Sequence, residues 1–228
     1  ATEVSFEGNG SMEGAQLVIP SVAKPFRSLS GSFEVNEKEA AVRDAAFSFG
    51  TATCNVNAII TDFDAPHIVG SLRTSTLNLN ELRTVVQRRS DKDELTPQRQ
   101  WADNLSLELL IEADSLYAGA VATGPVSSVC RMAERKCIFE PLEIAAFGGN
   151  LSGNLELETS GDNIAWKSRF TGRDIQLDRL MSQAGAEKTK ATGNLEISGR
   201  LYGFAGTPDA LKTMDGQLSV KATDGNIK

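Results

Sequence analysis

The side chains that could act as nucleophiles, bases or metal ligands are few and scattered along this chain. His67 is the single histidine, and it follows Pro66 in an expected turn before a strand. One imidazole cannot form a histidine-rich metal site, and the sequence context ties no serine or cysteine to it as a nucleophile. We therefore expect an ordinary role for His67.

Two short patterns resemble known chemical motifs only in part. Residues 21–24 read Ser-Val-Ala-Lys, the Ser-x-x-Lys pattern of penicillin-recognising enzymes, but no Ser-Asp-Asn or Lys-Thr-Gly element accompanies it. Residues 8–14 have the glycine density of a phosphate-binding loop but lack its lysine and its following helix. We interpret the first as a chance match and the second as a hairpin turn.

Acidic residues cluster at Asp62 and Asp64, beside an expected strand end, and at 91–94. Neither cluster has the ligand spacing of a calcium loop. We therefore predict no metal site and no cofactor. Carboxylates from separate strands could still meet as a glycosidase pair, which sequence spacing leaves open.

The cysteines suggest a different chemistry. Cys130 and Cys137 lie seven residues apart across an expected hairpin, while Cys54 has no evident partner. In an oxidising compartment the pair could close a disulfide; otherwise it is two half-buried thiols. The spacing does not match a zinc signature, which needs further ligands.

Composition limits the classes of protein that fit. The 228 residues are 40% hydrophobic and 23% charged, with a net charge of -7, which predicts a folded chain that repels nucleic acid. No run of about 18 apolar residues could span a bilayer. Because the chain starts at Ala1 without a signal-like segment and stops inside an expected strand, we expect it to be a piece of a longer protein.

The elements that must position these residues are mainly β-strands. Apolar and polar residues alternate with period two, and glycines interrupt the pattern at short intervals, as in a long antiparallel meander. The residues expected on one apolar face are Leu105, Leu107, Leu109, Ile111, Leu142, Ile144, Leu155, Leu157, Leu195, Ile197, Leu218 and Val220. We predict a long twisted sheet curled into a groove or open barrel.

Short capping helices are predicted at 79–89, 177–184 and 208–213, each after a strand. Residues 88–102 are charged and without periodicity, which is typical of a linker or loop. This divides the chain into a first β repeat at 1–87, the linker, and a second β repeat at 103–228, within one continuous sheet.

The division into repeats follows from an internal similarity. Residues 46–56, running on to 77–82, return as 145–155, running on to 175–180; Gly50 corresponds to Gly149 and Leu79 to Leu177. A repeat of strands closed by a short helix favours an extended, stacked architecture over a single catalytic pocket.

The second half resembles the C-terminal region of AsmA-family proteins. The similarity lies in the order of its elements over residues 103–228: the segment Gly-Gly-Asn-Leu-Ser-Gly at 148–153, a cap at 174–180, a Gly-x-Leu strand from Gly193, and a closing unit at 211–227. Residues 1–87 follow more loosely through the repeat. The absent membrane anchor and the Cys130 to Cys137 insertion depart from the family pattern.

The resemblance implies a Gram-negative envelope protein, anchored in the inner membrane by an N-terminal helix and extending into the periplasm. It implies a role in moving phospholipid toward the outer membrane, or in assembling that membrane, with acyl chains along an apolar β-groove and an envelope protein as a further partner. The groove lining would be the apolar face defined above. The protein would not be an enzyme.

Two alternatives remain open on the sequence. The apolar face could be the sealed core of a structural β-scaffold that binds a protein partner, or the chain could be a carbohydrate-active enzyme. An open meander and a closed one bury the same alternating pattern, so the sequence does not separate them.

Overall fold

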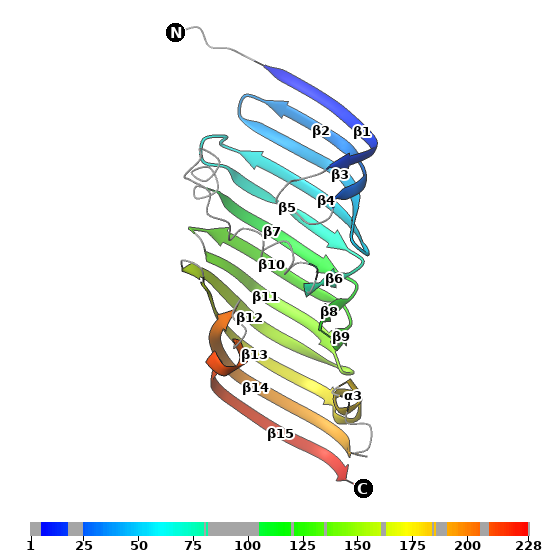
Figure 1. Cartoon of the computed structure of the whole chain (residues 1–228), viewed down its shortest axis with the longest axis vertical. Helices are drawn as coiled ribbons and strands as arrows, with labels where there is room; N and C mark the ends of the chain where they lie inside the picture. The colour runs from blue at the N-terminus through cyan, green and yellow to red at the C-terminus, as the bar shows by residue number, and fades with distance from the viewer. Residues whose placement is uncertain are drawn as a thin grey trace.

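The chain is seen in a computed structural model that describes residues 6–17, 25–79, 81, 105–119, 121–134, 136–160, 163–183, 185, 191–205 and 210–227. Strands dominate this part of the chain, and they form one long sheet (Figure 1). The predicted linker at 88–102 and the Ser-x-x-Lys segment at 21–24 lie outside the described residues.

The structure has 15 described strands. They are β1 (Glu7–Leu17), β2 (Phe26–Asn36), β3 (Glu39–Phe49), β4 (Ala52–Thr61), β5 (His67–Thr74), β6 (Leu77–Asn78), β7 (Ser106–Ala113), β8 (Leu116–Ala118), β9 (Val121–Thr123), β10 (Val126–Ala133), β11 (Lys136–Ala146), β12 (Gly149–Ser160), β13 (Asn163–Gln176), β14 (Ala191–Ala205) and β15 (Asp215–Ile227). The helical elements are α3 (Leu177–Gln183) and the 3-10 turn η2 (Ala210–Thr213).

The large sheet has 12 strands in the order β1-β2-β3-β4-β5-β7-β10-β11-β12-β13-β14-β15. β1 and β15 lie at opposite ends, so the sheet is open and does not close into a barrel (Figure 1). The predicted mainly-β sheet, curled into a groove, is confirmed. One pairing departs from the antiparallel meander: β5 and β7 run parallel.

Because β5 and β7 run in the same direction, the chain leaves the sheet at the same edge after each of them. The register that joins Thr74 to Ala113 continues beyond the large sheet, where Leu77 pairs with Leu116 in β6 and β8. Leu77 N donates to Ser115 O across 2.8 Å at the bend between the two sheets. The meander prediction missed this because periodicity gives strands but not the direction in which a chain returns.

Following the pairings from strand to strand divides the large sheet into two faces. Paired residues point to the same side, so one set of register partners defines each face. We call the apolar face the side that carries Phe33, Val42, Val56, Leu72, Ile111, Val126, Ile144, Leu151, Phe170, Ile197 and Val220. The other side is the polar face.

The polar face carries ion pairs between neighbouring strands. Three of these ion pairs join residues that are register partners on neighbouring strands. Their nitrogen–oxygen distances are 2.6 Å for Arg73–Glu112, 3.2 Å for Arg131–Glu108 and 3.4 Å for Lys221–Glu196. Solvent screens exposed pairs of this kind, so they add little to stability. These ion pairs therefore make this face polar but contribute little to the stability of the sheet.

One long edge of the sheet carries a ridge of short elements, which we call the lip: β6, β8, β9 and α3 (Figure 1). β8 pairs with β6 and β9, and the amide of Gln183 on α3 then bonds to both backbone groups of Ala122 on β9, at 2.9 and 3.2 Å. This side chain continues the pairing as an additional strand would. α3 itself contacts β13 and β14.

The structure agrees with the three predicted helices to different extents. The helix at 177–184 is confirmed as α3, with Ala184 outside the described residues. Leu79 and Glu81 are helical, but the remainder of 79–89 lies outside the described residues. The third helix is a 3-10 turn at Ala210–Thr213 rather than an α-helix. No helix in the described ranges has the length and apolar character to span a membrane.

Candidate functional site

The residues predicted to share one apolar face do so in the structure, with one exception. All of the predicted lining residues within strands lie on the apolar face, from Leu107 on β7 to Val220 on β15. Leu105 precedes β7 and has no register partner. The apolar face therefore runs across the whole sheet and is not confined to one cluster.

In the middle of the sheet the apolar face is the less exposed side, as expected for the inner side of a curl, and two pairs of consecutive residues of the same type show this. Ile59 on the polar face is 44% exposed, whereas Ile60 on the apolar face is half-buried. Leu110 is 40% exposed and Leu109 is half-buried. Identical side chains thus differ in exposure according to their face, so the apolar side lines a groove.

Glycines shape this lining. Every strand glycine with a register partner in the described part of the large sheet lies on the apolar face: Gly8, Gly10, Gly31, Gly70, Gly149, Gly153, Gly172, Gly199, Gly203 and Gly216. Aromatic side chains use the room that these positions leave. A Cβ at Gly10 would lie 2.6 Å from the ring of Phe33, and one at Gly203 would lie 3.3 Å from Trp166.

Among the described elements, only those of the lip and η2 lie outside the large sheet, so most of the sheet has no second described layer. At the β15 end, Leu218 and Val220 on the apolar face are 61% and 56% exposed. A continuous apolar surface of this kind marks an interaction site more often than a stable solvent-facing surface.

The lip covers one side of the groove. Ala113, Ala146, Ile175 and Leu195 all lie on the apolar face near the ends of strands that the lip borders, and all are buried. Ile175 is fully buried, two residues before α3 begins. The groove thus has a covered edge along the lip, whereas in the described part of the chain the opposite strand ends carry turns and the 3-10 turn η2.

An aromatic cluster lies at the N-terminal end of the groove. Phe26 on β2 packs edge-on against Phe47 at 5.4 Å and stacks on Phe49 at 5.1 Å, both on β3. Sequence reasoning did not single out these three residues. The available signal was the spacing of Phe47 and Phe49, which lie two residues apart on β3 with the period of the apolar face.

The two predicted cysteine partners lie side by side in the groove. Cys130 and Cys137 place their Sγ atoms 3.1 Å apart on the apolar face, as two thiols. The hydrogen bond between them lowers the pKa of Cys137 and, together with burial, raises the pKa of Cys130. Cys54 is buried elsewhere; burial raises its pKa, and its thiol bonds to Thr74 Oγ1 at 3.5 Å.

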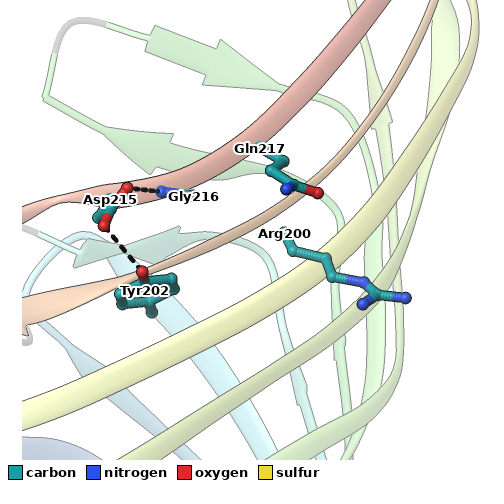
Figure 2. Close-up of a pocket in the computed structure, with 5 residues that line it drawn as sticks. All are labelled: Arg200, Tyr202, Asp215, Gly216 and Gln217. Atoms are coloured by element: carbon teal, nitrogen blue, oxygen red, sulfur yellow. Dashed lines mark hydrogen bonds between the residues drawn. The ribbon is translucent and has the colours of Figure 1, made fainter.

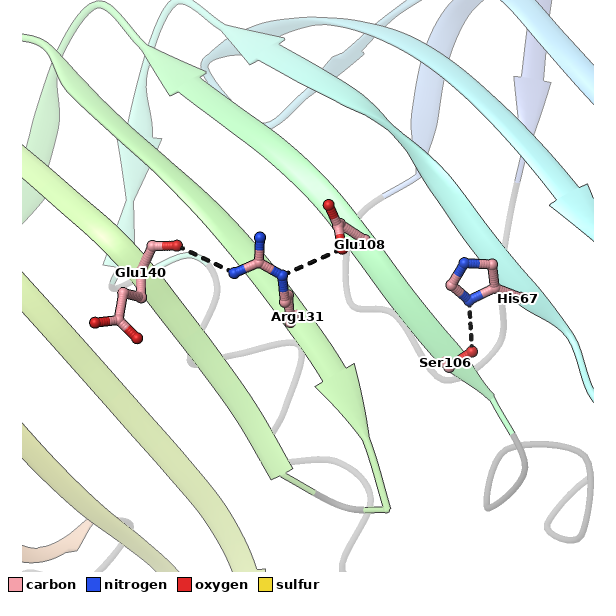
Figure 3. A network of polar contacts seen from close by, with 5 residues as sticks. All are labelled: His67, Ser106, Glu108, Arg131 and Glu140. Carbon is pink, nitrogen blue, oxygen red and sulfur yellow. Dashed lines mark hydrogen bonds and ion pairs between the residues drawn. The ribbon is translucent and has the colours of Figure 1, made fainter.

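The single histidine does acquire a serine partner that the sequence did not indicate. His67 Nδ1 and Ser106 Oγ lie 2.7 Å apart on the polar face because β5 and β7 pair in parallel (Figure 3). In serine hydrolases Nε2 meets the serine and Nδ1 holds a carboxylate. Here the ring is turned the other way, so this is a cross-strand polar contact rather than that catalytic arrangement.

Arg131 forms the neighbouring polar contact in Figure 3. Its guanidinium bonds to Glu108 Oε2 at 3.2 Å and reaches the backbone oxygen of Glu140 at 3.5 Å. It thus connects β10 to the strands on both sides. The carboxylate of Glu108 is occupied by this pairing.

A shallow depression of about 310 Å³ lies at the β14–β15 end, on the polar face (Figure 2). The Tyr202 hydroxyl donates to Asp215 Oδ2 at 2.8 Å, which raises the pKa of Tyr202 and lowers that of Asp215. A backbone bond from Gly216 lowers the pKa of Asp215 further. Arg200 and Gln217 complete the wall.

Neither this depression nor a second one of about 710 Å³ beside α3 presents a pair of carboxylates. The first holds Asp215 and the second Asp178 as its acidic residue. Glycoside hydrolysis requires two facing carboxyl groups. Within the described residues, no group of three or more His, Cys, Asp or Glu side chains is placed to hold a metal ion.

Glu156 is the most enclosed charge of the polar face. Its Oε2 lies 2.7 Å from Lys136 Nζ and 3.0 Å from Lys167 Nζ, one lysine from each neighbouring strand. The two ammonium groups lower the pKa of Glu156, and Glu156 in turn raises the pKa of Lys136. This pairing links the side chains of β12 to those of β11 and β13.

Comparison with protein-family models, curated protein sequences and solved structures returns no match to this chain.

Proposed function

We propose that this chain is a periplasmic segment of an AsmA-like, inner-membrane-anchored protein that binds phospholipid acyl chains along its apolar face and conducts them toward the outer membrane. The observation that carries the proposal is the predominantly apolar face that extends across the 12 strands of the large sheet. The order of Gly-Leu strands in residues 103–228 supports the AsmA assignment, and hence the envelope location.

The chemistry of the lining suits an acyl chain. Aromatic residues make up 6% of the chain, and the groove is lined mostly by aliphatic side chains and glycine, which offer contact without fixed hydrogen-bond geometry. Each methylene moved from water onto such a surface contributes about 0.8 kcal/mol. A chain arriving from a bilayer exchanges one apolar environment for another, so it enters and leaves at little net cost.

We place the headgroup in water, beyond the strand ends opposite the lip. Acyl chains would lie against the apolar face while polar headgroups project past the strand ends opposite the lip. This arrangement requires no specific headgroup pocket. The activity is therefore proposed as binding and conduction without a catalytic step.

The shared architecture of two segments supports a repeated unit. β3, β4 and β5 precede the helical residue Leu79 as β11, β12 and β13 precede α3, and Ile68 and Trp166 occupy corresponding positions on the apolar face. We propose that such units lengthen the groove by addition, so that conduction depends on the continuity of the face.

Native mass spectrometry of protein purified without a delipidation step tests the proposal. We expect mass increments that tandem fragmentation identifies as phospholipid. The proposal would be refuted if protein purified from cells that contain phospholipid carried no lipid and acquired none from vesicles. A stably bound polypeptide in place of lipid would support the protein-binding scaffold instead.

A further inference from the structure

The thiols of Cys130 and Cys137 lie together on the groove lining, and the proposed function gives them no role. Their register partners are apolar: Cys130 lies opposite Leu109 and Phe139, and Cys137 lies opposite Met132 and Leu157. Neither thiol contributes a charge or a packing volume that an alanine or valine could not supply. Their Sγ separation of 3.1 Å brings the two sulfurs together.

Local structure explains how residues seven apart come together. β10 and β11 form a hairpin in which Met132 pairs with Cys137 and Cys130 with Phe139, so the two cysteines are diagonal neighbours on one face. Diagonal side chains are usually about 7–8 Å apart between their Cα atoms. The register shift between Ser128 and Cys130 lies next to the pair and alters the local twist.

The two thiols differ in access. Cys130 is 5% exposed, whereas Cys137 is half-buried near the hairpin end at Ala133 and Lys136, at the strand ends opposite the lip. The thiol nearer to solvent is also the one whose pKa is lowered by its neighbour. Thiolate character and access together determine which cysteine attacks a disulfide.

We infer that Cys130 and Cys137 are a dithiol–disulfide couple that exchanges with a disulfide-bearing oxidant, with Cys137 as the attacking thiol and Cys130 as the resolving thiol. The Cys137 thiolate attacks one sulfur of the oxidant, forms a mixed disulfide and releases the first thiolate. Cys130 then loses its proton and attacks Cys137 Sγ, which releases the second. The protein gives up two electrons and two protons, and the oxidant becomes two thiols.

This assignment goes beyond the proposed function and does not rest on lipid binding. It gives the groove lining a modification site whose substrate class is a disulfide, carried by either a small molecule or a protein. Closure would covalently join β10 to β11 near the centre of the sheet. Cys54 is the natural control, because it is buried and bonded to Thr74.

The test uses the full chain with glutathione disulfide as the probe. We expect the intact mass to fall by two hydrogen atoms, with peptide mapping placing the bond between Cys130 and Cys137 and Cys54 remaining reduced. Cys54→Ser should react in the same way. Unchanged mass with both thiols still open to alkylation in denaturant, or bonds formed only between molecules, would overturn the inference.

Two further variants test the order of attack. Cys130→Ser should accumulate a stable glutathione adduct on Cys137, because no resolving thiol remains. Cys137→Ser should form the adduct on Cys130 at least about tenfold more slowly, since that thiol is buried and burial alone still raises its pKa. Equal rates, or faster reaction at Cys130, would contradict the assigned order. The wild-type measurement remains decisive if either variant fails to fold.

Discussion

The ring of Phe170 on β13 occupies the space that a side chain at Gly199 on β14 would need: a Cβ at position 199 would lie 2.9 Å from Phe170 Cζ. On the other neighbouring strand, Gly153 also lies opposite Phe170. An aromatic residue between two glycines lets adjacent strands curl around it without crowding. The inner surface of the groove is built from such relationships.

Substituting Gly199 should therefore destabilise the sheet. We expect Gly199→Val to cost about 1–3 kcal/mol of unfolding free energy, because the new side chain meets both the Phe170 ring and the Gln217 backbone oxygen. Urea unfolding measures the effect. Ser198→Val, one residue away on the polar face, is the control and should change stability by less than about 0.5 kcal/mol. Equal losses from both variants would contradict this role for the glycine.

The lip should depend on Gln183. Gln183→Ala removes both bonds to Ala122, and we expect a loss of about 1–2 kcal/mol together with faster amide exchange in β9. Ser182→Ala, the adjacent exposed position on α3, should leave exchange in β9 unchanged. If β9 exchanges no faster in Gln183→Ala than in the parent, α3 does not hold the lip through this side chain.

The pairing of Glu156 predicts a dependence of stability on pH. Because Lys136 and Lys167 lower the folded-state pKa of this carboxyl, its contribution is present above the unfolded pKa of about 4.3 and is lost as pH falls through the lower folded value. Glu156→Gln should therefore destabilise the protein at pH 7 and lose that effect toward pH 3. Chemical unfolding at both pH values measures this.

Glu143→Gln is the matched control for Glu156, since Glu143 lies exposed on the same face of β11. It should have little effect at pH 7. A destabilisation by Glu156→Gln that is as large at pH 3 as at pH 7 would show that the charge of Glu156 is not the cause.

Lipid loading should distinguish two consecutive residues of β12. Leu157 lies on the apolar face opposite Trp166, and Glu158 lies on the polar face opposite Lys136. Leu157→Lys should reduce bound phospholipid at least about tenfold, equivalent to about 1.4 kcal/mol, because an ammonium group in the acyl-chain path must be desolvated. Glu158→Lys introduces the same side chain on the opposite face and should leave loading unchanged.

Native mass spectrometry counts the bound lipids in both variants, and circular dichroism confirms that each retains its sheet. Equal loading by the two folded variants would contradict an acyl-chain site on the apolar face. Loss of loading in both would indicate that charge acts through the whole molecule rather than through one face.

The sequence predicted much of the sheet because period-two alternation directly encodes which residues share a face. Leu107 and Leu109 on β7, and Leu195 and Ile197 on β14, lie where alternation placed them. α3 was also predictable, since Leu177 begins a helical apolar spacing directly after a strand. These are local signals, carried by residues close together in the chain.

Other features could not be predicted because they depend on how distant segments meet. The contact of His67 with Ser106 requires the parallel register of β5 and β7, and the bond from Gln183 to Ala122 joins residues 61 apart in sequence. The face occupied by the glycines was readable in principle, since Gly149 and Gly153 share the parity of Leu151 and Leu155. Composition alone suggested only turns.

The most direct test of the groove as the acyl-chain site is site-specific photocrosslinking at pairs of identical, consecutive residues on opposite faces. A benzophenone amino acid replaces Leu109 or Leu110 on β7, and Ile60 or Ile59 on β4, in protein mixed with phospholipid vesicles and then separated from them. We predict phospholipid adducts at Leu109 and Ile60, on the apolar face, and none above background at Leu110 and Ile59. Adducts of equal yield on both faces, or none at Leu109 and Ile60, would contradict the account.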